Sequence, residues 1–221
     1  MKLRFMKKND EGNDVWSFYF KPLEPLTWIA GQSVRLELPR KMFGIDERRF
    51  TITSAPFESH VMITTKLSDS SFKQNLRNLK PDEIINGYAV EGKFVWDKDM
   101  RHRLLIAGGI GITPYRSMIA QKIYEKQPLD ATLIYSSKAK PAVFEKELLQ
   151  WQRQDLSFHC HFLISKRLIF NDYATLVPAW LQSKVYISGP SKMVEELSSY
   201  LLEFGLSESY LKQDLFTGNL D

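Results

Sequence analysis

The hydrophobic pattern of the chain changes its period near residue 98. Before that point, short runs alternate between apolar and polar residues, as strands with one buried face do. The clearest runs are VWSFYF (15–20), SVRLEL (33–38), RFTITS (49–54) and HVMITTK (60–66). One further stretch, 71–79, has the apolar spacing of a helix. The first 98 residues are therefore predicted to form a small antiparallel β-barrel.

After residue 98, buried-type strands alternate with helices. Strands are predicted at 103–107, 131–137, 158–164 and 184–189, and helices at 113–124, 144–154 and 192–205. This alternation predicts right-handed βαβ units, and so a doubly wound parallel sheet with helices on both faces. We expect two domains, residues 1–98 and residues 99–221.

Composition excludes several classes of protein. Thirty basic and 26 acidic residues leave a net charge of +4 without a long basic run, so no nucleic-acid partner is expected, whereas an acidic protein partner suits a weakly basic face. The single cysteine, Cys160, cannot supply the ligands of an iron–sulfur cluster. His159 and His161 are expected to lie on a sheet surface, and no metal site is predicted. The chain has no signal-peptide pattern and no run near the ~20 apolar residues of a membrane span, so a cytoplasmic protein is expected.

The segment LLIAGGIGITPYRSM (104–118) reads as strand, glycine-rich turn and helix. Its glycines let the backbone turn sharply and approach a ligand closely. Thr113 and Pro114 fit the Ncap and N1 positions of the next helix, whose free amides favour a phosphate. The spacing differs from the dinucleotide fingerprint. Taken alone, the segment is equally compatible with a glycine turn that binds nothing.

Two other segments carry candidate site residues. In RRFTITS (48–54), Arg48 and Phe50 share one strand face and Arg49 and Thr51 the other. An ordinary strand does not need cations, a flat ring and hydroxyls so close together, which indicates a bound ligand. In YISGPSKMVEEL (186–197), Ser188 falls at the carboxyl end of a strand, where open α/β sheets bind ligands. Alone, that segment is better interpreted as a Gly-Pro turn before a helix.

Together these segments resemble the ferredoxin–NADP reductase superfamily over almost the whole chain. The flavin motif Arg-x-Tyr-(Ser/Thr) is similar to residues 48–51, with Phe50 in place of tyrosine. The nucleotide motif Gly-Gly-x-Gly-x-Thr-Pro matches residues 108–114 at every fixed position. The family's Cys-Gly-Pro…Met resembles residues 188–193, with Ser188 in place of the thiol, and its closing Phe-x-Gly-Tyr resembles residues 216–219, with Asn219 in place of tyrosine.

The resemblance implies a flavin-binding barrel followed by a nicotinamide-nucleotide-binding domain, with FAD and NADP(H) or NAD(H) as cofactors. Arg48 would pair with the flavin pyrophosphate, Phe50 would lie against the isoalloxazine ring, and Thr51 would bond near flavin N5. Phe216 would lie on the opposite flavin face. Thr51, Thr113 and Ser188 would be the catalytic residues. The remaining cofactor contacts implied are Thr65, Lys66, Ser70, Ser71, Phe72, Lys73, Gly108, Gly109, Ile110, Gly111, Pro114, Ser136, Ser137, Lys138, Gly189, Pro190 and Met193.

The expected function is that of a flavin-dependent reductase, which takes hydride from NAD(P)H onto FAD and passes electrons to a separate acceptor. That acceptor would be a ferredoxin, a flavodoxin, an oxygenase component or a small molecule. The alternatives are a non-catalytic flavin-binding subunit of a larger electron-transfer assembly and an α/β protein without a cofactor. The loop 135–141 carries Lys138 and Lys140 but no acidic residue, which favours NADPH slightly over NADH. A solvated basic loop that contacts nothing has nearly equal weight.

Overall fold

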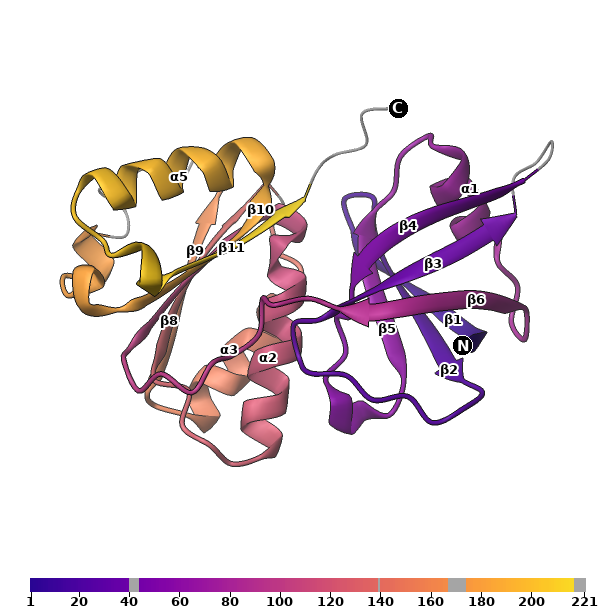
Figure 1. Ribbon diagram of the computed structural model, residues 1–221, viewed down its shortest axis with the longest axis horizontal. Coiled ribbons are helices and arrows are strands. Elements are labelled where there is room, and N and C mark those ends of the chain that lie inside the picture. The colour runs from indigo at the N-terminus through magenta and orange to yellow at the C-terminus, as the bar shows by residue number, and fades with distance from the viewer. Residues whose placement is uncertain (40–43, 139, 167–173, 217–221) are drawn as a thin grey trace. The chain divides into compact units, whose positions relative to one another are not determined.

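The computed structural model describes residues 1–39, 44–138, 140–166 and 174–216 (Figure 1). Its contacts divide the chain into two units. The first, called the barrel unit, comprises Met1–Trp96 and Arg116–Gln121. The second, called the sheet unit, comprises Asp97–Tyr115 and Lys122–Asp221. Each unit is therefore built from two separate stretches of chain.

The barrel unit holds a six-stranded antiparallel sheet in the order β4-β3-β6-β1-β2-β5. The segment after β4 closes this sheet, because the Thr53 amide donates to the Met62 carbonyl at 2.7 Å on β5. The elements of the unit are β1 (Lys2–Gly12), β2 (Val15–Pro22), β3 (Ser33–Pro39), β4 (Ile45–Thr51), η1 (Pro56–Glu58), β5 (Val61–Lys66), α1 (Ser71–Asn78) and β6 (Ile84–Glu91). The predicted barrel is confirmed.

Alternating apolar side chains fill the interior of this sheet. Phe18 and Phe20 on β2 and Val34 and Leu36 on β3 are fully buried, as the two-residue period of a strand requires. Helix α1 adds Phe72 and Leu76 to the same core. These two residues are four apart, so one face of α1 covers the barrel and the opposite face is left for polar side chains.

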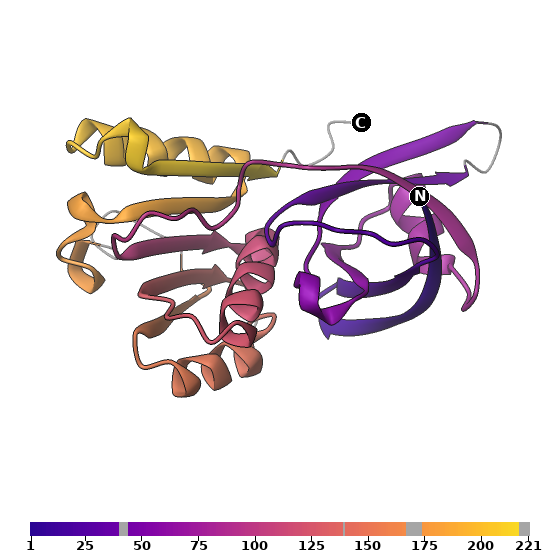
Figure 2. The ribbon, with the colours of Figure 1, turned by 60° about the horizontal axis from the view of Figure 1, so that its bottom comes forward.

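The sheet unit holds five parallel strands in the order β11-β10-β7-β8-β9. Its elements are β7 (Arg103–Gly108), η2 (Gly109–Gly111), α2 (Ile112–Tyr124), β8 (Ala131–Ser137), α3 (Glu145–Gln154), β9 (Phe158–Ile164), η3 (Trp180–Gln182), β10 (Lys184–Pro190), α5 (Ser191–Glu203), η4 (Glu208–Tyr210) and β11 (Leu211–Phe216). Figure 2 shows α5 along one face of the sheet and α3 along the other. The predicted doubly wound sheet is confirmed.

The strand order defines where this sheet can bind a ligand. From β7 the chain proceeds through β8 to β9 in one direction, and then returns to β10 and β11 on the other side of β7. The order therefore reverses between β7 and β10. In open α/β sheets, ligands bind outside the carboxyl ends of the strands at such a reversal. Gly108 and Pro190 end those two strands.

Three strands, β1, β6 and β11, lie outside the predicted elements. Six of the eleven residues of β1 are Lys, Arg, Asp or Glu, and β6 contains an Asn-Gly pair typical of a turn. Both strands pair through their backbones, and only a few side chains, such as Leu3, Phe5 and Ile85, enter the core. Tertiary pairing therefore overrides a weak local signal in these segments.

Candidate functional site

Strand β4 and helix α1 of the barrel unit bring several predicted site residues together. Asp46, Arg48 and Phe50 alternate along β4 and so share one face. The Arg48 guanidinium lies 3.3 Å from the Asp46 carboxylate. The other oxygen of that carboxylate accepts a 3.0 Å hydrogen bond from the Ser71 hydroxyl, in the first turn of α1. Asp46 therefore holds the motif arginine and the start of the helix in one cluster.

Asp46 is a site residue that the sequence analysis missed. Its side chain is 4% exposed and contacts two groups from different elements. The signal for it was available, because a residue two positions before Arg48 lies on the same strand face. A buried carboxylate there limits the rotamers of Arg48, so the guanidinium is pre-organised for a second anion.

Three cations lie close to one another beside the start of α1. Burial, together with the positive charges of Arg48 and Lys66, lowers the pKa of Lys73. The Lys73 ammonium donates to the Lys66 carbonyl at 2.7 Å, which keeps it in the group. Like charges gathered in this way repel one another, and an anion placed among them would relieve the repulsion. We call Arg48, Lys66 and Lys73 the cation cluster.

The start of α1 has the same preference for an anion. Ser70 occupies the Ncap position, and its side chain makes no capping hydrogen bond to the helix. The first amides of an α-helix lack intrahelical partners and lie at the positive end of its dipole. An oxyanion at this point would therefore receive amide hydrogen bonds as well as the charge of the cluster. The cofactor contacts of Ser70, Ser71, Phe72 and Lys73 stay a prediction.

The aromatic ring of the motif rests on α1. The Phe50 ring lies 5.5 Å from the Phe72 ring, centroid to centroid, at an interplanar angle of 35°. Phe72 is fully buried, whereas Phe50 is only partly buried. Phe50 therefore has a supported ring that keeps accessible surface. The buried Thr51 and the anchored Arg49 lie on the other face of β4, where the Arg49 Nε donates to the Ser33 hydroxyl at 2.5 Å.

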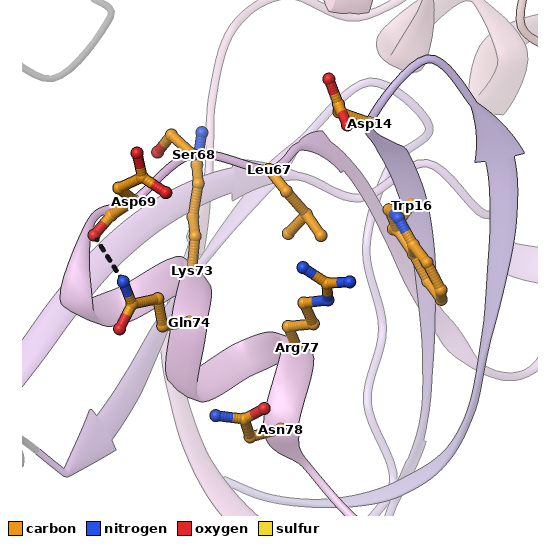
Figure 3. Close-up of a pocket in the computed structure, with 9 residues that line it drawn as sticks. All are labelled: Asp14, Trp16, Leu67, Ser68, Asp69, Lys73, Gln74, Arg77 and Asn78. Carbon is orange, nitrogen blue, oxygen red and sulfur yellow. Dashed lines mark hydrogen bonds between the residues drawn. The ribbon is translucent and has the colours of Figure 1, made fainter.

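A groove of about 580 Å³ adjoins the cation cluster (Figure 3). Lys73, Gln74 and Arg77 project from α1 on one side of it, and Trp16 on β2 lies across from them. The Arg77 guanidinium lies 5.9 Å from the centre of the Trp16 ring. The remaining lining residues are Asp14, Leu67, Ser68, Asp69 and Asn78. The groove thus offers a flat aromatic surface, carboxylates and cations beside the proposed anion site.

In the sheet unit, the glycine turn packs tightly against the end of β10. A Cβ atom added to Gly111 would lie 2.2 Å from the Ser188 carbonyl oxygen. A Cβ on Gly108 would lie 2.4 Å from the Met193 sulfur, and one on Gly189 would lie 2.7 Å from the Met193 methyl group. Met193 therefore fills the space that two glycines leave open. This packing is a physical reason for the Ser-Gly-Pro…Met spacing.

The capping role predicted for Thr113 and Pro114 is wrong. Helix α2 begins at Ile112, directly after the 3₁₀ turn Gly109–Gly111, so both residues lie inside its first turn. The Thr113 hydroxyl donates to the Ile110 carbonyl at 3.0 Å and is buried. The glycines let the helix begin earlier than a side-chain cap would require. The backbone amides of the turn, rather than the Thr113 side chain, are the groups left for an anion.

Ser188 is fully buried at the carboxyl end of β10. Its hydroxyl donates to the Asp214 carboxylate at 3.2 Å on the neighbouring strand β11. Asp214 was not among the predicted residues, because only the pairing of β10 with β11 brings it to Ser188. Phe216 ends β11 opposite Pro190, and its carbonyl accepts a 3.2 Å bond from the Ser191 hydroxyl. Residues 217–219 of the closing motif lie outside the described residues.

Three of the predicted cofactor contacts, Ser136, Ser137 and Lys138, have different surroundings from one another. Ser136 pairs with Gly108 across the sheet, so this loop starts beside the glycine turn. The Ser136 hydroxyl donates to the Lys166 carbonyl at 2.9 Å, and Ser137 is buried. Lys138 is exposed. Of the three, Lys138 therefore has the side chain best placed to meet a ligand from solution.

The sequence matches a family model for the oxidoreductase NAD-binding domain over residues 105–168, the segment that contains the glycine turn. Over 95% of its length, the chain is 24% identical to Flavohemoprotein A of Dictyostelium discoideum and spans 58% of that relative.

Two solved structures share the fold over nearly their whole lengths. One is the flavohem-like FAD/NAD binding domain of a nitric oxide dioxygenase from Vibrio cholerae, with a TM-score of 0.87, 18% identity, and coverage of 97% of this chain and 98% of that one. The other is a ferredoxin–NADP⁺ reductase from Neisseria gonorrhoeae with bound FAD and NADP, with a TM-score of 0.81, 15% identity, and coverage of 97% and 98%.

These findings confirm the resemblance that was predicted from the sequence. The chain has the two-part fold of the solved ferredoxin–NADP⁺ reductase, and its residues 105–168 match the oxidoreductase NAD-binding domain. Among the described residues, no helix is both long enough and apolar enough to cross a membrane. The same residues contain no group of three or more His, Cys, Asp or Glu side chains that could hold a metal ion.

Proposed function

We propose that the protein is an NAD(P)H-dependent flavoprotein reductase that passes electrons to a separate acceptor. The observation that carries the proposal is the glycine turn 108–111, which lies at the strand-order reversal of the sheet, inside the segment that matches an NAD-binding family. Residues 1–98 would form the flavin domain and residues 99–221 the nucleotide domain.

The barrel unit fits an FAD. Arg48, Lys73 and the first amides of α1 would hold the pyrophosphate, and the supported ring of Phe50 would lie against the flavin ring system. The adjoining groove, at about 580 Å³, lies in the usual range for a ligand pocket. It would take the adenosine, whose base could stack on Trp16. This groove supports FAD rather than FMN.

The sheet unit fits the other nucleotide. The backbone amides of the glycine turn would bind the pyrophosphate of NAD(P)H, because Gly108 and Gly111 let the turn pack closely against the end of β10 and a Cβ on Gly109 would meet nothing within 4 Å. Ser188, oriented by Asp214, and Thr113 would border the nicotinamide. Phe216, at the end of β11, is proposed to cover the flavin until nicotinamide stacks there. A bound flavin supplies the ability to accept two electrons together and release them singly.

The acceptor is proposed to be a redox protein or domain. The flavohemoprotein relative, by its name, carries a haem, and the matching part covers 58% of that relative. A net charge of +4 favours an acidic partner surface. Ferredoxins, flavodoxins, oxygenase components and haem domains are the classes to test.

An absorption spectrum of the purified protein, with and without anaerobic NADPH, tests the proposal. Flavin bands that bleach on adding NADPH or NADH support a reductase. Flavin bands that persist with both nucleotides indicate a non-catalytic flavin-binding subunit. A spectrum without flavin bands, even after incubation with FAD and FMN, would contradict both.

The cation cluster allows a prediction about Lys73. We expect Lys73→Met to weaken FAD binding about 10- to 150-fold, the range for a lost charged hydrogen bond, without lowering the melting temperature of the FAD-free protein. The reason is that the folded state lowers the pKa of Lys73, so its charge is disfavoured there and its removal relieves repulsion. Titration with FAD and thermal unfolding measure the two effects.

Lys80→Met is the matched control, since Lys80 is exposed and lies just beyond α1. It should change neither the FAD affinity nor the melting temperature. If Lys73→Met destabilised the FAD-free protein while its FAD affinity stayed unchanged, the cluster would be a structural feature and not an anion site.

We further expect a higher kcat/KM with NADPH than with NADH, and a smaller preference in Lys138→Ala. A 2′-phosphate favours cations near the ribose, and Lys138 is an exposed cation two residues after Ser136, which pairs with Gly108. Lys126→Ala is the control, because Lys126 follows α2, near the amino ends of the strands. A higher kcat/KM for NADH that Lys138→Ala leaves unchanged would contradict the preference.

A further inference from the structure

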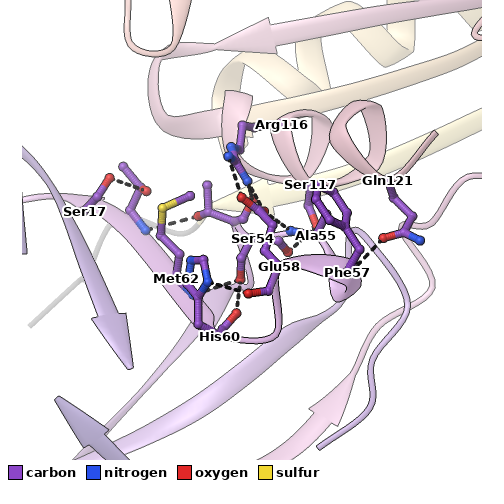
Figure 4. Close-up of polar contacts among 12 residues, drawn as sticks. Ser17, Ser54, Ala55, Phe57, Glu58, His60, Met62, Arg116, Ser117 and Gln121 are labelled. Carbon is purple, nitrogen blue, oxygen red and sulfur yellow. Dashed lines mark hydrogen bonds and ion pairs between the residues drawn. The ribbon is translucent and has the colours of Figure 1, made fainter. Parts of the chain in front are cut away.

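Helix α2 presents three polar side chains, Arg116, Ser117 and Gln121, to the loop that follows the flavin motif (Figure 4). This part of α2 belongs to the barrel unit, whereas the first turn of the same helix belongs to the sheet unit. The loop comprises residues 52–60, between β4 and β5, and includes η1. We call these contacts the α2 clamp.

The central contact of the clamp is a two-pronged ion pair. The Arg116 Nη2 donates to the Glu58 Oε1 at 2.9 Å, and the Nη1 donates to the Oε2. The two side chains are 9% and 17% exposed, so solvent screens the pair weakly. The Glu58 Oε2 also accepts a 2.6 Å hydrogen bond from the Ala55 amide. The carboxylate thus fixes the loop backbone and the helix side chain at once.

The clamp also binds the backbone immediately after the flavin motif. The Thr53 carbonyl accepts from the Arg116 guanidinium at 3.4 Å, and the Ser54 carbonyl accepts from the Ser117 hydroxyl at 2.7 Å. The Ser54 hydroxyl in turn donates to the His60 carbonyl at 2.7 Å and accepts from the Met62 amide at 2.9 Å. The residues that follow Thr51 are therefore held on both sides, by α2 and by β5.

A buried ion pair is a poor choice if stability is its only role. Apolar side chains of similar volume are commonly as stabilising, because they avoid the desolvation of two charges. What a guanidinium–carboxylate fork adds is geometry, since two parallel hydrogen bonds fix both the distance and the orientation of the groups. The pair is therefore suited to placing α2 in one defined position on the loop.

We propose that Arg116 and Glu58 are positioning residues for hydride transfer. This inference rests on the proposed reductase function. The turn proposed to hold the NAD(P)H pyrophosphate runs directly into α2, and the loop held by Glu58 runs directly from the flavin motif. The clamp ties the two cofactor-binding segments to a single helix. A misplacement of about 1 Å can slow a reaction about 100-fold. A small movement of α2 should therefore slow hydride transfer.

The test compares a variant that lacks the fork with the parent protein. The double variant Glu58→Gln/Arg116→Met removes both charges and so leaves no unpaired ion in the interior. We expect its flavin to be reduced by NADPH about 10- to 100-fold more slowly in anaerobic stopped-flow measurements. Its affinities for FAD and NADPH should stay within about threefold of the parent. The absorbance that arises when nicotinamide stacks on flavin should weaken.

A second variant and a control separate positioning from folding. Arg116→Lys keeps the positive charge but lacks the two-pronged guanidinium. Its flavin should therefore also be reduced more slowly than that of the parent. Arg35→Met breaks the exposed Arg35–Glu47 pair of the same unit and should leave the rate unchanged. In the flavin-free double variant, hydrogen exchange at the amides of residues 53–55 and 57 should be faster than in the parent.

Parental reduction rates in both clamp variants would overturn the inference and leave the reductase proposal intact. A loss of rate that follows only a fall in melting temperature or a loss of FAD would overturn it too, by showing a merely structural role. A parent protein that neither NADPH nor NADH reduces would overturn the proposed function itself.

Discussion

Gly111→Ala is expected to abolish NAD(P)H binding and to destabilise the protein by about 3 kcal/mol or more, which corresponds to a fall in melting temperature of about 6–12 °C. The added Cβ would lie 2.2 Å from the Ser188 carbonyl oxygen and 2.7 Å from the Gly189 amide nitrogen. These are backbone atoms, so no side-chain rotation can relieve the clash. The glycine turn or the end of β10 must move, and both border the proposed nucleotide site. Thermal unfolding and NADPH titration measure the two effects.

Gly109→Ala is the matched control for this substitution. Gly109 lies two positions earlier in the same turn, and a Cβ there would meet nothing within 4 Å. Its φ of +53° is the left-handed conformation, which costs a residue other than glycine about 1–2 kcal/mol. We therefore expect a smaller loss of stability and retained nucleotide binding. Equal effects of the two substitutions would show that the close approach to Ser188 does not limit this turn.

Arg48→Ala is expected to weaken FAD binding about 10- to 150-fold, as the loss of a charged hydrogen bond worth ~1.5–3 kcal/mol requires. The guanidinium is held by Asp46, beside Ser71 at the start of α1 and near Lys73. Its removal takes away the cation that the carboxylate orients. The flavin that remains bound after gel filtration, measured by absorbance, reports the effect.

Arg49→Ala provides an internal comparison for the neighbouring guanidinium. Arg49 lies on the opposite face of β4 and is bonded to Ser33. It should retain flavin as the parent does. Full retention of flavin by a folded Arg48→Ala protein would mean that the motif assignment is wrong.

The sequence predicted the strands and helices that have a regular hydrophobic pattern along their own length. The period of two along β2 to β5 and the alternation of strands with helices after residue 98 defined the barrel and the parallel sheet. The missed strands β1, β6 and β11 are rich in charged residues or contain a turn-like pair, and they are stabilised by backbone pairing that no local pattern reveals.

The residues of the candidate site also fall into those that the sequence predicted and those that it missed. Arg48, Phe50 and the glycine turn belong to motifs that can be read in a single segment. Asp46, Glu58 and Asp214 depend on contacts between distant segments: Asp46 with Ser71, Glu58 with Arg116, and Asp214 with Ser188. The capping prediction for Thr113 failed because the 3₁₀ turn lets α2 begin one residue earlier.

The division of α2 between the two units has a consequence for modular exchange. A fragment cut before α2 would leave Glu58 without Arg116 and the Ser54 carbonyl without the Ser117 hydroxyl. A buried carboxylate stripped of its partner is strongly unfavourable. A barrel excised for grafting would therefore need a surrogate for the middle of α2, and a recombination junction placed beyond Tyr124 would keep that helix whole.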